Sequence, residues 1–65
     1  MNKLVSGQEI SIKFLERVNF PTHGIEFNEG NNARVVFLTL AGRYVKFQIG
    51  RLQFVCLTRK IKLLD

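Results

Sequence analysis

Residues 34–49 read RVVFLTLAGRYVKFQI, and this stretch decides the fold class. Its second half alternates between an apolar set and a polar set: Val45, Phe47 and Ile49 against Tyr44, Lys46 and Gln48. A period of two is typical of a strand with one buried face. The first half, Arg34 to Leu40, is apolar on both faces, so we expect a strand that is covered on two sides. The Ala41-Gly42 step between the halves predicts a tight turn and hence an antiparallel hairpin.

Two further strands are predicted toward the C-terminus. After a tight turn at Ile49-Gly50, residues Arg51 to Thr58 are again apolar on both sides. Arg59 to Leu63 alternates, and we expect Lys60 and Lys62 on one face of that strand. Strands joined by tight turns are neighbours in a sheet, so these segments extend the hairpin.

The N-terminal third allows two interpretations. From Ile10 to Phe20 the even positions are apolar in five cases of six, Glu16 being the exception, which favours one half-buried strand. A helix remains the alternative, because Ser6-Gly7-Gln8-Glu9 matches the capping-box pattern that opens helices. Further along, two turns at 20–24 and 28–32 enclose a short strand at Ile25 and Phe27.

We therefore expect an all-β fold. A single domain over residues 1–65 would contain five or six short strands in an antiparallel meander that forms a small barrel or sandwich. A chain of 65 residues buries only about 60% of its unfolded surface, so its stability is marginal without a further stabilising element. One cysteine gives no disulfide within the chain, and the sequence holds no set of metal ligands. Oligomerisation is the element that remains, and we expect a homo-oligomer.

The composition argues against several classes of function. The longest uncharged apolar run, Val35 to Gly42, is far shorter than the roughly 20 residues that cross a bilayer, and no secretory signal opens the chain. We expect a cytoplasmic protein with no membrane contact. Cys56 is interpreted as a small buried hydrophobe and His23 as a solvated loop residue, and no cluster fits a catalytic set. The sequence thus predicts no enzyme, no cofactor and no metal.

Charge is unevenly distributed along the chain. The formal net charge is +5, yet residues 1–29 hold three basic and four acidic side chains, whereas residues 30–65 hold seven basic side chains and one carboxylate. A long segment of one sign indicates a polyanionic partner. Basic residues on a strand face neutralise phosphates, and an aromatic ring beside them stacks on bases. We therefore predict a face that binds RNA, or less favourably single-stranded DNA, made of Arg43, Tyr44, Lys46, Gln48, Arg51, Lys60 and Lys62.

Three fragments of the chain form a series. They are Ile12-Lys13-Phe14-Leu15-Glu16 followed by Val18-Asn19, then Leu40 to Gly50, then Thr58-Arg59. In this order they resemble the trp RNA-binding attenuation protein (TRAP) family. The resemblance implies an all-β subunit in a ring that binds single-stranded RNA around its rim, with Lys46 at one RNA-contacting position. Gln48 stands where the family has an arginine, and the segment between Ile25 and Arg34 is much shorter than the family's tryptophan-binding region, so tryptophan binding is not carried over.

Several alternatives stay open. A solvated face whose charges guard the sheet edges also explains the basic residues. A small phage- or plasmid-type inhibitor or adaptor of a host protein would use the two apolar strands, Arg34 to Leu40 and Arg51 to Thr58, as a partner interface. A ring that holds a small anion or nucleotide between subunits would use the same basic residues as RNA. As fold types, small basic SH3-like and Sm-like barrels share the size, charge and strand count, without a signature motif here.

Overall fold

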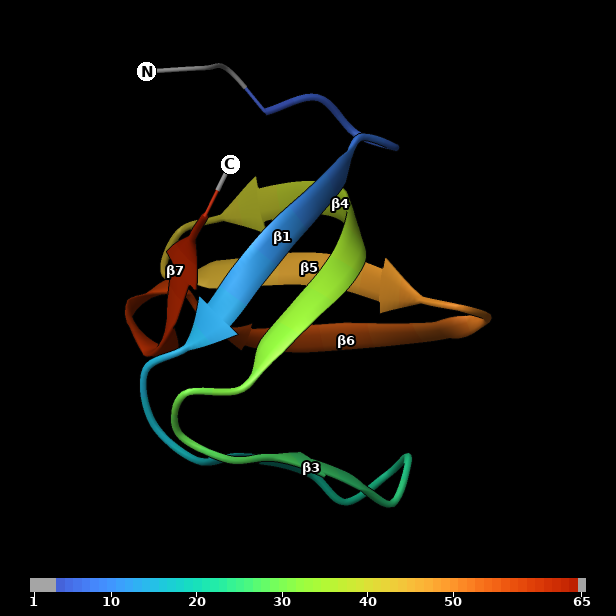
Figure 1. Ribbon diagram of the computed structural model, residues 1–65. Coiled ribbons are helices and arrows are strands. Elements are labelled where there is room, and N and C mark those ends of the chain that lie inside the picture. Colours follow the sequence, from blue (N-terminus) through green and yellow to red (C-terminus); the bar gives the residue numbers. More distant parts are fainter. Residues whose placement is uncertain (1–3, 65) are drawn as a thin grey trace.

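The computed structural model describes residues 4–64 and contains seven strands and one short 3-10 turn within them (Figure 1). The strands are β1 (Glu9–Phe14), β2 (Val18–Phe20), β3 (Ile25–Phe27), β4 (Asn32–Ala41), β5 (Tyr44–Ile49), β6 (Leu52–Leu57) and β7 (Ile61–Leu63), and the 3-10 turn η1 (Thr58–Lys60) precedes β7. The expected all-β fold class is thus confirmed. The predicted domain also includes residues 1–3 and 65, which lie outside the described residues. Across residues 4–64, no helix is long and apolar enough to cross a membrane.

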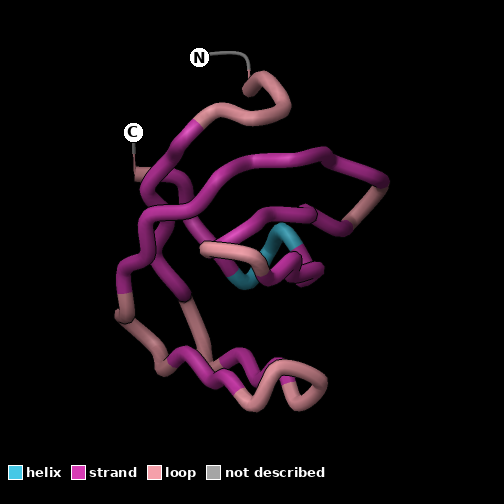
Figure 2. Tube along the Cα trace, turned by 90° about the vertical axis from the view of Figure 1, so that its right-hand side faces the viewer, coloured by secondary structure: helices cyan, strands magenta, loops and turns pink. Residues whose placement is uncertain are grey.

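Five of the strands form one antiparallel sheet in the order β6-β5-β4-β1-β7, and β2 pairs with β3 in a separate hairpin. The long strand β4 pairs with β1 along its first half and with β5 along its second half. Within the second half the register of β4 against β5 shifts by one residue, between Phe37 and Thr39. A bulge of this kind bends a strand. The sheet therefore curves, and β1 and β7 lie across β5 and β6 instead of beside them (Figures 1 and 2).

The sheet does not close into a barrel within residues 4–64. Strand β6 pairs only with β5, and β7 pairs only with β1, so β6 and β7 are the two edges. Two details of the predicted meander differ in the structure. Residues 4–64 contain seven strands, five of them in the main sheet, instead of five or six, and β7 pairs with β1 instead of with β6. The last strand thus returns to the first after the 3-10 turn η1.

The single strand predicted from Ile10 to Phe20 is interrupted at residues 15–17. The apolar even positions belong to two strands, β1 and β2, on either side of an exposed bend. Glu16 explains the interruption, because a strand that continued through it would bury a carboxylate. Instead the Glu16 carboxylate lies at the surface, 3.9 Å from Arg59 and 4.0 Å from Lys60. The helix alternative is wrong, and the short strand at Ile25–Phe27 is confirmed.

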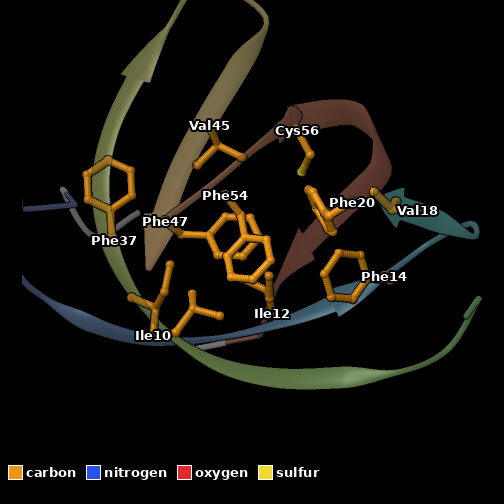
Figure 3. Close-up of a cluster of buried hydrophobic side chains, with 11 residues drawn as sticks. Ile10, Ile12, Phe14, Val18, Phe20, Phe37, Val45, Phe47, Phe54 and Cys56 are labelled. Carbon is orange, nitrogen blue, oxygen red and sulfur yellow. The ribbon is translucent and has the colours of Figure 1, made fainter. Parts of the chain in front are cut away.

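All six phenylalanines lie in or against one core. Figure 3 shows the five that are buried, and Phe27 of the β2–β3 hairpin packs against them. Ring centroids are 4.3 Å apart for Phe14 and Phe27, 4.8 Å for Phe20 and Phe54, and 5.4 Å for Phe47 and Phe54. Aromatic pairs at such distances contribute about 0.5–1.5 kcal/mol each beyond the area that they bury. Phe20 and Phe27 belong to the hairpin, so these rings attach the hairpin to the sheet.

Two loops of the same composition bound strand β5. Gly42-Arg43 joins β4 to β5, and Gly50-Arg51 joins β5 to β6. Both glycines have a φ of +60°, and no other residue type has a positive φ in the described part of the chain. A positive φ at the first loop position alone is what a type II′ hairpin turn requires. The tight turns predicted at Ala41-Gly42 and Ile49-Gly50 are therefore present, displaced by one residue along the chain.

Candidate nucleic-acid interface

The outward face of β5 carries three of the side chains predicted to bind nucleic acid. Val45 and Phe47 point into the core and are 4% and 1% exposed, so Tyr44, Lys46 and Gln48 share the opposite face. Strand β5 lies between β4 and β6, and the sheet therefore fixes it along both sides. Tyr44 is 50% exposed, which leaves its ring accessible for stacking on a base.

A small hollow opens on this face beside Tyr44 and Lys46. It has a volume of about 130 Å³, and Thr39 and Ala41 of β4 and Val55 of β6 complete its lining. The register accounts for this grouping, because Lys46 lies opposite Thr39 on one side and opposite Val55 on the other. An aromatic ring, apolar side chains and the aliphatic part of Lys46 thus surround the same space. Thr39, Ala41 and Val55 are additions that the sequence interpretation missed.

Gln48 has a structural contact as well as an outward position. Its carboxamide nitrogen donates a hydrogen bond to the carbonyl oxygen of Gly50 at 2.8 Å. This bond holds the Gln48 side chain over the β5–β6 loop. The carboxamide oxygen remains as an acceptor for a base edge or a ribose hydroxyl.

Arg43 and Arg51 lie at opposite ends of β5, each as the second residue of its two-residue loop. The Arg43 loop is fixed by Thr58, whose backbone N–H and hydroxyl both donate to the carbonyl oxygen of Arg43, at 2.7 Å and 3.0 Å. Both arginines are exposed. Positive charge is therefore present at both ends of β5 and, through Lys46, at its centre.

The carboxylates that form ion pairs do so away from β5. Closest distances are 3.4 Å for Glu9–Arg34, 2.7 Å for Glu26–Arg17, 3.9 Å for Glu16–Arg59 and 4.0 Å for Glu16–Lys60. Within residues 4–64, no carboxylate forms an ion pair with Arg43, Lys46 or Arg51. An anionic ligand would therefore meet these three cations without displacing a carboxylate of the described chain.

Lys60 and Lys62 are not brought together with the β5 residues. Residues 58–60 form η1 instead of a strand, so the prediction that both lysines share one strand face is wrong. Lys60 is half-buried beside Glu16, whereas Lys62 is exposed on β7 opposite Lys13 of β1. In the order of strands within the sheet, β7 is also the edge opposite β6. A role for these two lysines in binding stays a prediction, and it would concern a second surface.

A second hollow lies at the end of β5 that Arg43 occupies. Its volume is about 390 Å³, and Arg43, Leu57, Thr58 and Arg59 line it. Leu57 lies opposite Tyr44 in the β5–β6 register, so this hollow adjoins the outward face of β5. The sequence interpretation assigned Arg59 to a strand and missed it as a site residue. Only the 3-10 turn brings Arg59 to the same hollow as Arg43.

The surroundings of His23 and Cys56 do not suit nucleophilic catalysis. The prediction of a solvated His23 is wrong: the residue is half-buried, and its Nε2 lies 2.8 Å from the carbonyl oxygen of Gln53. Cys56 is buried as predicted. Burial raises the pKa of the Cys56 thiol above its ordinary value, and the nearby positive charge of Lys60 offsets part of the rise. A buried thiol that keeps its proton is a poor nucleophile.

Metal binding has no support in the described part of the chain, where no group of three or more His, Cys, Asp or Glu side chains could hold an ion.

No model of a known protein family matches the chain, and no curated protein or solved structure matches it. The resemblance to the TRAP family therefore rests on the sequence fragments quoted above and stays a prediction.

Proposed function

We propose that this protein binds single-stranded nucleic acid, RNA ahead of single-stranded DNA, through the outward face of β5. One observation carries the proposal. Arg43, Lys46 and Arg51 form no ion pair with any carboxylate of residues 4–64, and Tyr44 lies half exposed between two of them in sequence. The cations would neutralise phosphates, while the Tyr44 ring and the hollow beside Lys46 would take a base.

A single strand suits this surface better than a duplex. The Tyr44 ring and its hollow need an unstacked base, and a duplex keeps its bases stacked inside. Within residues 4–64 there is no helix to enter a major groove, the commonest way to read a duplex. RNA is placed ahead of DNA because of the resemblance to the TRAP family, and because a ribose 2′-hydroxyl offers a donor to the carboxamide oxygen of Gln48.

We also propose that the protein acts as a homo-oligomer, in the cytoplasm. Strand β6, which reads LQFVCL, is a six-residue sheet edge without a charge or a proline. Edge strands of monomeric proteins are normally short or charged, since an unprotected edge pairs with other chains. The opposite edge, β7, follows that rule with three residues and Lys62. Val55 and Leu52 of β6 are 53% and 38% exposed. A second copy paired with β6 would cover this edge and join two β5 faces in one continuous sheet.

Binding of a labelled single-stranded RNA at several salt concentrations tests the proposal. Three phosphate contacts predict a slope of about −2 for the logarithm of the binding constant against the logarithm of the salt concentration. The same RNA in duplex form is the control and should bind more weakly. A native mass spectrum of protein purified without removing nucleic acid gives the oligomeric state and any bound nucleotides. A binding constant that does not change with salt would contradict the proposal.

A protein-binding inhibitor or adaptor is the second candidate function, and the uncharged β6 edge favours it too. An extended segment of a host protein would add to β6 as an extra strand, with affinity from backbone hydrogen bonds. The two strands predicted as a partner interface, β4 and β6, differ in the exposure of their outward side chains. On β4, the outward Val36 and Leu38 are half-buried, whereas on β6 Val55 is exposed. A bare monomer that binds no nucleic acid would favour this candidate over the first.

A further inference from the structure

The hollow at the end of β5 has the chemistry of an anion site. Arg43 and Arg59 both line it, and they come from different elements, the β4–β5 loop and η1. Guanidinium groups match phosphate oxygens through paired hydrogen bonds, and this geometry is the reason that arginine is common where phosphate is bound. At about 390 Å³ the hollow is many times larger than the roughly 30 Å³ that a water molecule occupies in the liquid.

The two arginines keep their charge available to a ligand. Thr58 fixes the Arg43 loop through two hydrogen bonds to the carbonyl oxygen of Arg43. The loop therefore does not depend on the Arg43 guanidinium group for its conformation. Arg59 has Glu16 as a neighbour, with Nη1 and Oε2 3.9 Å apart, and its side chain is 72% exposed. An exposed ion pair at this distance contributes little energy. Glu16 also lies 4.0 Å from Lys60, so a single carboxylate faces two cations.

The hollow is continuous with the proposed base-binding face. Leu57 lines the hollow and is the cross-strand partner of Tyr44, and Arg43 precedes Tyr44 in the chain. Side chains directly opposite each other on paired strands have Cβ atoms about 4.5–5.5 Å apart. A nucleotide whose base lies on the Tyr44 ring therefore has its phosphate within reach of the hollow.

We propose that the hollow lined by Arg43, Leu57, Thr58 and Arg59 binds a phosphate group of the nucleotide whose base stacks on Tyr44. This inference rests on the proposed function and deepens it, since it names the end of β5 at which the nucleic-acid strand is anchored. The phosphate is either a terminal monophosphate or an internal phosphodiester. Both present negatively charged non-bridging oxygens to the two guanidinium groups, three in a terminal monophosphate and two in an internal phosphodiester.

Titrations followed by amide NMR spectra test the site with three probes: inorganic phosphate, adenosine 5′-monophosphate and adenosine. Inorganic phosphate should shift the amide signals of Thr58 and Arg59. The nucleotide should shift these signals and that of Tyr44 together, and it should bind at least about tenfold more tightly than adenosine, because the charged hydrogen bonds are absent from adenosine. Shifts confined to other parts of the chain, or equal affinity for nucleotide and nucleoside, would overturn the site.

Arg59→Ala is the decisive variant, and Arg17→Ala is its matched control. Arg17 is also an exposed arginine, with a side chain 66% exposed, and it also pairs with a surface carboxylate, Glu26. Arg59→Ala should remove the phosphate response and reduce nucleotide affinity by about tenfold, while Arg17→Ala should leave both unchanged. Arg59→Lys should restore only part of the affinity, because an ammonium group lacks the paired donors. Equal losses in the Arg59 and Arg17 variants would show a general charge effect and overturn the site.

Two oligonucleotides that differ only in a 5′-phosphate distinguish the sources of the group. A preference for the phosphorylated oligonucleotide that Arg59→Ala removes assigns the hollow to a terminal phosphate, and equal affinities that fall alike in Arg59→Ala assign it to an internal one. Different experimental results would contradict the proposed function and the proposed phosphate site. RNA binding that depends on Lys46 without any response to phosphate would overturn the site alone. A phosphate response that Arg59→Ala removes, without any RNA binding, would overturn the proposed function alone.

Discussion

His23, in the turn of the β2–β3 hairpin, donates a hydrogen bond from Nε2 to the backbone carbonyl oxygen of Gln53 at 2.8 Å. Its ring also meets that of Phe54 edge-on, with centroids 4.9 Å apart. Gln53 belongs to the edge strand β6, so His23 ties the tip of the hairpin to that edge. It also occupies one backbone acceptor of β6, which leaves the part of the strand around Val55 to Leu57 as the more accessible edge.

Replacing His23 by alanine should lower the free energy of unfolding by about 1–2 kcal/mol, because the variant loses one hydrogen bond and one aromatic contact. Urea unfolding of the two proteins measures the difference. Thr22→Ala, an exposed position in the same turn, is the control and should change stability by less than about 0.5 kcal/mol. If His23→Ala were as stable as the parent, the phenylalanine rings alone would hold the hairpin.

Lys46→Ala should weaken single-stranded RNA binding by about tenfold and leave the fold intact, because the ammonium group lies on the outward face while the core lies on the other side of β5. The salt slope of binding should become shallower by about 0.7, the contribution of one phosphate contact on a single strand. Lys13→Ala is the control, since Lys13 is a lysine on a strand of the same sheet, although it is exposed and Lys46 is half-buried. Full RNA binding by Lys46→Ala would remove Lys46 from the interface.

Gly50→Ala should cost about 1–2 kcal/mol of stability, because φ at this position is +60° and alanine is strained there. No side chain would clash with the added methyl group, since nothing lies within 4 Å of its position, so the cost is one of backbone conformation. Thermal or urea unfolding measures it. Arg51→Ala in the same loop should leave stability unchanged and reduce RNA binding, which separates the two loop positions by role.

The buried thiol of Cys56 makes stability depend on pH in the alkaline range. Its pKa in the folded protein is raised above the ordinary value of 9.0, chiefly by burial, so the unfolded chain loses this proton at a lower pH than the folded protein does. The contribution is therefore fully present below about pH 9 and is lost as the pH rises through the folded pKa. Urea unfolding from about pH 8 upward should show this fall. In Cys56→Ala this part of the pH dependence should be absent, and an unchanged pH profile would contradict the assignment.

If the proposed oligomer forms through β6, Val55→Lys should convert it to a monomer, because the variant adds a charge to the middle of the uncharged edge strand. Native mass spectrometry reads the change directly. Val5→Lys is the control, since Val5 is 62% exposed and lies outside the strands. Oligomers of unchanged size in Val55→Lys would place the contact between copies on another surface.

Sequence reasoning was most successful where the structure depends on neighbours in the chain. The alternation around Val45 and Phe47 and the two glycine turns predicted β5 and its loops, because side-chain direction in a strand has a strict period of two. The pairing of β7 with β1 joins opposite ends of the chain, and no local pattern encodes such a pairing. The break at Glu16 was visible as a mismatch in the alternation, yet only the structure shows the bend that the mismatch produces.

The residues of the candidate site also fall into two groups, those that a local pattern predicts and those that depend on contacts between distant segments. Tyr44, Lys46 and Gln48 were grouped from the sequence because they alternate along one strand. The hollow beside Lys46 also needs Thr39 and Val55, and their positions depend on the cross-strand register, including the bulge at Leu38. Arg59 was missed because the alternation at the C-terminus favoured a strand, whereas η1 turns the chain there.

The two short loops around β5 also determine how long a ligand must be. Arg43 and Arg51 are separated by the six residues of β5 and by Gly50, and the strand alone spans roughly 20 Å, a length that neither loop is long enough to vary. An oligonucleotide shorter than this span reaches only one of the two arginines. Affinity should therefore increase with oligonucleotide length until the span is covered and then level off, so the length of β5 would set the minimum length of an oligonucleotide that contacts both arginines.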